Sequence, residues 1–360
     1  MAKFEGVHWG SVQLQYLLAE KQSALLPERA MAHTVSRSIH YGLFLVFEGI
    51  RFFVANVEGA LEVRFLNWHL NRSRFLRGMA YSLSAEQQEI LPSDAELEQL
   101  LLSFFYRPEL KPFLKEMADT QAQGYLRPYT LDEEQSIGVT FPAKPSIRVA
   151  LCRYDRYLGE PFEGVVVPQL VRAVRSNQTG CLKLGTNYLI SVKAVEAARR
   201  LVPEAGAALF LDDQCHLPLF EREVTEWDSS CCLFAFRDGT IVKIPEGPLI
   251  LPSVTIQGVI ALARAKGLHV EERPMTYGEL VQRSKSGELV TVCSLGTAGV
   301  MNRAQRLHLP DLEGQILAVH QADTAHPLYE AMGELRRDYW ALYTSETPPE
   351  DPFVRSRYTL

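Results

Sequence analysis

At residues 181–188 the chain reads Cys-Leu-Lys-Leu-Gly-Thr-Asn-Tyr, and the rest of the sequence is organised around this stretch. It follows the short apolar run 164–167 and precedes an amphipathic segment from Asn187 to Leu201, which places Lys183 in a strand-to-helix connection. Loops of this kind commonly present reactive groups on a rigid scaffold. A buried lysine loses hydration, and its free amine can attack the carbonyl of a keto substrate or of an aldehyde cofactor. Because most loop lysines are solvated surface charges, the assignment depends on the residues that accompany Lys183.

The length and composition predict an ordinary globular protein of two domains. The chain has 360 residues, 47% of them apolar and 22% charged, and exceeds the size at which single cores stop growing. A formal net charge of -6 argues against general nucleic-acid binding, which needs clustered positive charge. We therefore expect no nucleic-acid partner.

Neither a membrane nor a metal is expected from the sequence. No apolar run approaches the length of a membrane span, and the first six residues are too polar for a signal peptide. The six cysteines show neither a CxxC pair nor metal-finger spacing, which favours reduced thiols over disulfides. These features predict a cytoplasmic protein that does not depend on a metal.

The domain boundary is expected in a polar, tyrosine-bearing stretch, Arg153–Pro161. We therefore predict a smaller domain over residues 1–158 and a larger one over 159–360 that carries Lys183. The tail from Thr344, rich in proline and charge, is expected to be loose.

Four dispersed residues suit a phosphorylated cofactor with a pyridine ring. Thr255 lies at the start of a predicted helix, where free N–H groups attract phosphate, and Thr297 lies in a small-residue turn. Arg74 has the bidentate geometry that phosphate prefers. Glu226, at a strand end, is able to keep a pyridinium nitrogen protonated. Each residue alone has an ordinary explanation as a cap or a surface charge.

The order of the motifs resembles that of a known family. The chain contains, in sequence, Phe-Glu-Gly-Ile-Arg at 47–51, Arg-x-x-Arg-Gly at 74–78, Tyr-Leu-Arg-Pro at 125–128, Lys-Leu-Gly-Thr-Asn-Tyr at 183–188, Thr-Glu at 225–226, Leu-Pro-Ser-Val-Thr at 251–255 and Gly-Thr-Ala at 296–298. This order resembles the branched-chain amino acid aminotransferases, class IV enzymes of pyridoxal phosphate (PLP) fold type IV, over about residues 36–343. The resemblance implies a two-domain α+β fold, with a small N-terminal α/β domain and a larger C-terminal α/β pseudo-barrel domain, and a homodimer.

The resemblance also implies roles for individual residues. Lys183 would form the Schiff base with PLP and then shuttle the substrate proton. The other implied cofactor contacts are Tyr188 to the phenolic oxygen, Glu226 to the pyridine nitrogen, and Arg74, Val254, Thr255 and Thr297 to the phosphate. The resemblance also implies that Thr297 and Ala298 bind the substrate α-carboxylate. Tyr125 and Arg127 would line the side-chain pocket, where Arg127 would bind the distal carboxylate of glutamate. Tyr41 and Phe47 would form the apolar wall of this pocket.

The chain departs from the family pattern at several places. Thr186 replaces a glycine, so the backbone there must accept a β-carbon. One extra residue lies between Gly42 and Phe47, and another follows Glu226, which leaves Glu223 as a competitor for the pyridine nitrogen. Because small changes in an apolar pocket reorder substrates, we expect a shifted donor preference.

The predicted activity is a PLP-dependent aminotransferase that uses an apolar, branched-chain-like L-amino acid and 2-oxoglutarate in a ping-pong Schiff-base mechanism. Two alternatives remain at this point. One is another fold type IV enzyme, such as a lyase, or a transaminase for a D-amino acid or a specialised metabolite. The other is a non-catalytic homologue, against which the retained lysine, tyrosine and phosphate-binding residues weigh.

Overall fold

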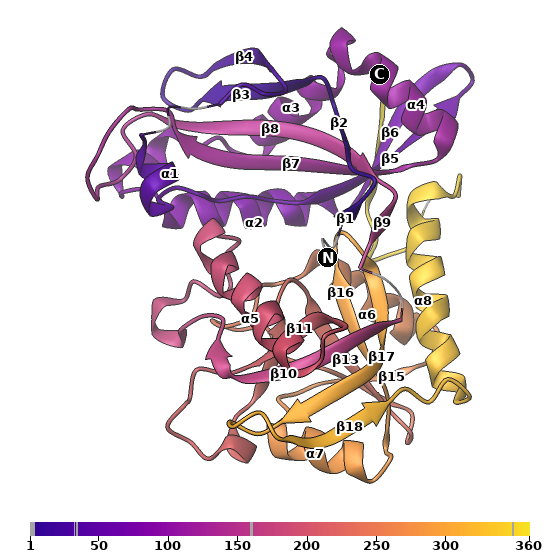
Figure 1. Ribbon diagram of the computed structural model, residues 1–360. Helices are drawn as coiled ribbons and strands as arrows, with labels where there is room; N and C mark the ends of the chain where they lie inside the picture. Colours follow the sequence, from indigo (N-terminus) through magenta and orange to yellow (C-terminus); the bar gives the residue numbers. More distant parts are fainter. Residues whose placement is uncertain (1–3, 32, 34, 159–160, 348) are drawn as a thin grey trace. The chain divides into compact units, whose positions relative to one another are not determined.

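The computed structural model describes residues 4–31, 33, 35–158, 161–347 and 349–360. The chain divides into two compact units (Figure 1). The N-terminal unit contains Phe4–Asp155, Leu182–Thr186 and Leu342–Leu360. The C-terminal unit contains Arg156–Cys181 and Asn187–Ala341. Lys183 thus belongs to the N-terminal unit, although the strand before it and the helix after it belong to the other.

An eight-stranded sheet with antiparallel pairings forms the N-terminal unit. The strands in order across the sheet are β19 (Arg355–Thr359), β6 (Ala60–Leu66), β5 (Ile50–Val57), β7 (Gln123–Asp132), β8 (Pro145–Tyr154), β3 (Val12–Leu17) and β4 (Gln22–Pro27), and β2 (His8–Trp9) pairs with β8. The short strand β1 (Phe4–Glu5) precedes them. The long pairing of β7 with β8 fixes the face on which Tyr125 and Arg127 lie.

The helices of the N-terminal unit are α1 (Arg37–Tyr41), α2 (Trp68–Tyr81), α3 (Asp94–Phe105) and α4 (Lys111–Thr120), with 3₁₀ turns η1 (Glu86–Ile90) and η2 (Pro108–Leu110). Helix α3 begins with a capping box. The Ser93 hydroxyl accepts a hydrogen bond from the Glu96 N–H, and the Glu96 carboxylate accepts one from the Ser93 N–H. The ring of Phe65 on β6 stacks on Trp68 of α2, with centroids 4.2 Å apart, and so joins helix and sheet.

A nine-stranded mixed sheet forms the C-terminal unit. Its strands in order are β12 (Val224–Trp227), β11 (Ala205–Leu211), β10 (Phe162–Val171), β17 (Val300–Pro310), β16 (Leu289–Gly296), β13 (Cys231–Phe236), β14 (Thr240–Lys243) and β15 (His269–Glu272), and β18 (Ile316–Gln321) pairs with β17. Strand β10 runs parallel to both of its neighbours, and β14 runs parallel to β15. Strand β9 (Arg156–Tyr157) precedes the sheet. The almost unbroken apolar sequence of β10 is typical of a strand that is buried on both faces.

The helices of the C-terminal unit are α5 (Tyr188–Leu201), α6 (Val254–Ala265), α7 (Tyr277–Lys285) and α8 (Pro327–Thr344), with 3₁₀ turns η3 (Arg175–Asn177), η4 (Gly185–Asn187), which begins in the lysine loop, and η5 (Leu219–Glu221). The small residues Ala194 and Ala198 let α5 pack closely on Val165 and Phe210 of the sheet. This packing fixes α5, whose first residue is Tyr188, on the sheet. The alternation of strands and helices confirms the predicted α+β fold class.

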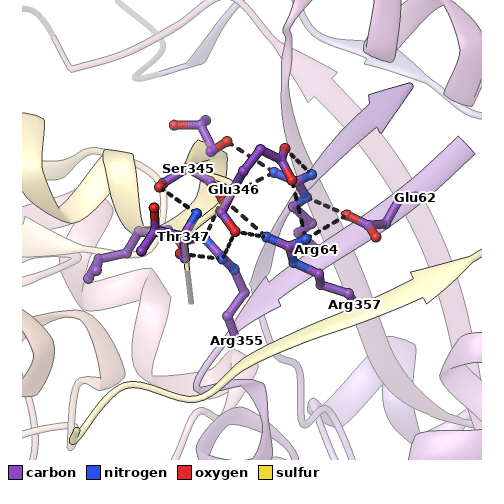
Figure 2. A network of polar contacts seen from close by, with 9 residues as sticks. Glu62, Arg64, Ser345, Glu346, Thr347, Arg355 and Arg357 are labelled. Atoms are coloured by element: carbon purple, nitrogen blue, oxygen red, sulfur yellow. Dashed lines mark hydrogen bonds and ion pairs between the residues drawn. The ribbon is translucent and has the colours of Figure 1, made fainter. Parts of the chain in front are cut away.

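The prediction of a loose tail from Thr344 is wrong. Strand β19 pairs with β6, from Arg355 opposite Leu66 to Thr359 opposite Glu62. Figure 2 shows why: the fully buried Arg64 guanidinium bonds to Glu62 at 2.6 Å and to Glu346 at 2.5 Å. Arg355 donates to the Ser345 carbonyl at 2.6 Å. A buried guanidinium requires partners, and the tail supplies them.

The predicted domain division at residues 158 and 159 stays a prediction, and Gly159 lies outside the described residues. Segments 182–186 and 342–360 of the predicted second domain lie in the N-terminal unit. Among the described residues, no helix is long and apolar enough to cross a membrane.

Candidate active site

The lysine loop is held by the segment that precedes β5. The Phe47 N–H donates to the Lys183 carbonyl at 3.1 Å, and the Gly185 N–H donates to the Leu45 carbonyl at 2.7 Å. Val46 and Leu184 form an antiparallel bridge between these two bonds. The backbone around Lys183 is therefore hydrogen-bonded to residues 45–47 in the manner of two short antiparallel strands.

The side chain of Lys183 lies among aromatic and cationic groups of the same unit. The residue is half-buried, and its Nζ lies 4.9 Å from the centre of the Phe47 ring. The guanidinium of Arg127 stacks over the same ring at 4.6 Å and over Tyr125 at 5.0 Å, and its Nη2 donates to the Tyr125 hydroxyl at 3.0 Å. The structure thus brings together Lys183, Phe47, Tyr125 and Arg127. Tyr41, at the end of α1, is exposed.

Arg74 lies on α2 and contacts a carboxylate that sequence reasoning did not assign. Its Nε and Nη2 atoms donate to the two oxygens of Glu48, each at 2.6 Å. Both side chains are buried. Burial alone would raise the pKa of Glu48, but the charge and hydrogen bonds of Arg74, with the charge of Lys183 and the Gly49 N–H, bring this pKa below its ordinary value. A negative charge therefore accompanies Lys183 and Arg74.

Glu226 lies on β12 in the C-terminal unit, with its carboxylate buried. The Arg172 guanidinium approaches Oε1 to 2.6 Å, and the Leu251 N–H donates to the same oxygen at 3.3 Å. Arg172 also donates to the carbonyls of Gly180 and Leu249, each at 3.2 Å. These contacts orient the carboxylate between the loop before Lys183 and the segment before α6. Sequence reasoning missed Arg172, since an arginine just past a strand end carries no local signal.

The competing Glu223 is in a different environment. It is half-buried just before β12, where its N–H donates to Asp212 at 3.2 Å and its backbone bridges Thr276. Glu226 is buried and paired with Arg172, whereas Glu223 is half-buried, and the choice between them as the partner of the pyridine nitrogen stays a prediction.

Two predicted phosphate contacts lie at the N-terminus of α6. Ser253 caps this helix by accepting the Ile256 N–H at 3.3 Å, and both Val254 and Thr255, in the first turn, are buried. The free N–H groups and the dipole of a helix N-terminus favour an anion there.

The Gly-Thr-Ala turn with Thr297 and Ala298 joins β16 to β17, and both residues are half-buried. The Ser230 and Ser294 hydroxyls lie 2.6 Å apart, which ties the base of this turn to the loop that follows Glu226. Tyr188, also half-buried, is the first residue of α5. The C-terminal unit thus contains the residues predicted for the ring and most of those predicted for the phosphate.

The departures from the family pattern are accommodated inside the units. Phe44, in the longer 42–47 segment, has φ +52° and is only 3% exposed. Trp227 is fully buried, donates to the Cys293 carbonyl at 3.2 Å and packs on Gly164, where any side chain would collide with its ring. Asp228 exchanges two hydrogen bonds with Ala208. Thr186 is not among the described residues with positive φ, and its methyl group occupies space that a β-carbon on Gly42 would need.

Comparison with known proteins identifies the family. The model of class IV aminotransferases matches residues 45–286. The chain belongs to the class IV aminotransferases. A probable branched-chain-amino-acid aminotransferase of Staphylococcus aureus (strain N315) is 28% identical over 300 residues, which cover 82% of this chain and 77% of the relative.

Solved structures agree with this aminotransferase fold. The branched-chain aminotransferase of Thermoproteus uzoniensis, solved with norvaline, has a TM-score of 0.67 at 21% identity, and the match covers 92% of this chain and 95% of that one. The branched-chain amino acid aminotransferase from Escherichia coli has a TM-score of 0.64 at 20% identity, and the match covers 95% of this chain and 97% of that one. The predicted family and fold type are therefore confirmed, and the enzyme is a PLP-dependent transaminase.

The side chains of this transaminase fit its family's cofactor. Lys183 offers an amine for an aldehyde, and the buried carboxylate of Glu226, oriented by Arg172, suits a pyridinium nitrogen. The N-terminus of α6 and the turn at Thr297 supply N–H and hydroxyl groups for phosphate.

Proposed function

We propose that the enzyme transfers the amino group of an apolar, branched-chain-like L-amino acid to 2-oxoglutarate in the two half-reactions of a ping-pong cycle. The observation that carries this proposal is the position of Arg127, whose guanidinium lies over the rings of Phe47 and Tyr125 beside Lys183. One pocket must accept an apolar side chain in one half-reaction and a distal carboxylate in the other. The two rings offer an apolar surface, and Arg127 offers a cation within it. The branched-chain aminotransferases among the relatives support the same substrate class.

The residues of the chain take the following roles in this proposal. Bound PLP supplies an electron sink for the bond to the substrate Cα. Lys183 Nζ holds the cofactor and moves the proton at the substrate Cα. Glu226 keeps the ring nitrogen protonated, and Tyr188 donates to the phenolic oxygen. The phosphate is assigned to Arg74, Val254, Thr255 and Thr297, the substrate α-carboxylate to the N–H groups of Thr297 and Ala298, and the apolar wall to Tyr41 and Phe47.

A shifted donor preference is part of the proposal. The two segments that are longer than in the family each contribute side chains to the core, Phe44 in one and Trp227 with Asp228 in the other. A core residue cannot be added without moving its neighbours, because protein interiors are close-packed. We therefore expect the pocket wall near Phe47 to differ from that of a leucine, isoleucine and valine transaminase.

A second copy of the chain is the proposed partner, and the cytoplasm remains the predicted location. Two adjoining segments of the N-terminal unit, joined by the bond from the Ser136 N–H to the Val35 carbonyl at 3.0 Å, expose large apolar side chains. These are Met31, Ile39, Tyr41, Ile137, Val139 and Phe141. Large apolar side chains that are exposed on neighbouring segments are typical of interaction sites. Light scattering of the Ile137→Asp variant tests the proposal, since a dimer through this patch would become a monomer.

The substrate screen tests the function itself. Purified protein supplied with PLP is assayed for kcat/KM with leucine, isoleucine and valine and with aromatic, longer-chain and D-amino acid donors, at fixed 2-oxoglutarate. Transfer from an apolar L-donor that surpasses the three branched donors supports the proposal with its shifted preference. Preference for a D-donor, or elimination products without transfer, would instead support another fold type IV reaction.

A further inference from the structure

The segment Leu43–Phe47 is held in a strained conformation. Phe44 carries a bulky side chain at φ +52°, a left-handed conformation that L-residues rarely adopt. Its side chain is buried, so the residue cannot relax by turning outward. Strain of this kind persists only where surrounding contacts determine it.

The hydroxyl of Thr130 on β7 bonds to two backbone groups of this segment. It donates to the Phe44 carbonyl at 2.7 Å and accepts from the Val46 N–H at 3.0 Å, while the Thr130 N–H donates to the Val46 carbonyl at 2.9 Å. Thr130 is completely buried. With valine in its place, the Phe44 carbonyl and the Val46 N–H would lose this partner away from water.

The same segment holds the lysine loop. The Leu45 carbonyl, between the two residues that Thr130 contacts, accepts the Gly185 N–H at 2.7 Å. The next residues along, Val46 and Phe47, form the bridge to Leu184 and the bond to the Lys183 carbonyl at 3.1 Å. A continuous chain of short contacts therefore leads from the Thr130 hydroxyl to the backbone of Lys183.

We propose that Thr130 is a positioning residue for the reactive lysine. Its hydroxyl fixes the left-handed Phe44 and its neighbours, and these set the position of the Lys183 backbone. The inference rests on the proposed role of Lys183 and deepens it. The alternative is that the hydroxyl only satisfies a buried carbonyl, as the Tyr277 hydroxyl does for Pro310 at 2.7 Å.

The test compares Thr130→Val, Thr130→Ser and Tyr277→Phe by backbone hydrogen exchange of the cofactor-free protein. Thr130→Val keeps shape and removes the hydroxyl, Thr130→Ser restores the hydroxyl, and Tyr277→Phe removes a buried hydroxyl bond far along the chain. We expect the amides of Phe47 and Gly185 to exchange about tenfold faster in Thr130→Val, the effect of one hydrogen bond, and at the wild-type rate in the other two. The kcat should fall in Thr130→Val and recover in Thr130→Ser.

Unchanged exchange at Phe47 and Gly185 in Thr130→Val, or equal loosening in Tyr277→Phe, would overturn the inference. Samples of the same proteins are also loaded with PLP and reduced with borohydride, and the lysine that carries the cofactor is identified by peptide mapping. Attachment to another lysine in the wild type would overturn the proposed role of Lys183, while the exchange result would still report whether Thr130 fixes the loop.

Discussion

Glu48 and Arg74 form a bidentate ion pair in which both bonds measure 2.6 Å and both side chains are buried. The pair joins the segment that holds the lysine loop to helix α2. A buried pair of this geometry tolerates the loss of one partner poorly, because the remaining charge stays desolvated.

The first prediction therefore concerns Glu48→Gln. We expect this change to lower the free energy of unfolding by about 3–5 kcal/mol, measured by urea denaturation. Asp119→Asn is the control, because it breaks an exposed pair with Lys115 and should cost less than about 1 kcal/mol. Since the folded-state pKa of Glu48 is lowered, its contribution is present above the unfolded value near 4.5 and lost as the pH falls below it. Equal effects of the two substitutions would contradict this account of the pair.

The second prediction separates the two glutamates. Glu226→Gln removes the charge that Arg172 orients, and the half-reaction should slow by on the order of 10²-fold, the scale of one well-placed catalytic contact. Glu223→Gln should be nearly neutral, because Glu223 is only half-buried and lies just before β12. Single-turnover kinetics with a good donor measures both. The opposite ranking would show that the extra residue after Glu226 is misplaced in the comparison with the family.

The third prediction addresses Arg127. Loss of a charged hydrogen-bond donor costs about 1.5–3 kcal/mol, so Arg127→Gln should raise the KM for 2-oxoglutarate roughly 10- to 100-fold. The KM for an apolar donor should change far less, because the rings of Phe47 and Tyr125 remain. Arg127→Lys, which retains the charge, should lie between. Equal losses for both substrates would indicate that Arg127 only supports β7.

The fourth prediction concerns acid stability. Burial lowers the pKa of His320 to about 4, from an ordinary value of 6.5. The unfolded chain binds a proton at His320 below pH 6.5, whereas the folded protein does so only near pH 4. The free energy of unfolding is therefore unaffected by His320 above pH 6.5, and it falls by up to about 3 kcal/mol as the pH falls from 6.5 to 4. His320→Gln should flatten the dependence of the unfolding free energy on pH in this window. An unchanged slope would refute the assignment.

Local signals predicted the fold better than distant ones. The amphipathic segment from Asn187 to Leu201 is a short-range pattern, and the structure has a helix there, Tyr188–Leu201. The docked tail was not predictable, because its ordering depends on Arg64 and Glu346, which lie far apart in the sequence. A charge-rich segment looks solvated until a buried partner for its charges is known.

The site residues also differ in how well local sequence patterns predicted them. Sequence motifs identified Lys183, Phe47, Tyr125 and Arg127, which the structure brings together. They did not identify the residues that pair with Arg74 and Glu226 or that hold the segment beside the lysine loop. Glu48, Arg172 and Thr130 act through pairings between distant strands and loops, and no local pattern announces such a pairing.

The central claim is that Lys183 carries the chemistry. Purified protein loaded with PLP is reduced with borohydride, digested and mapped by mass spectrometry. We predict that the reduced cofactor is found on the peptide that contains Lys183. The Lys183→Ala variant should fold normally but carry no covalently bound cofactor. The Lys193→Ala variant, which changes an exposed lysine of α5, should carry the cofactor as the wild type does. Attachment to another lysine, or to none, would contradict the account.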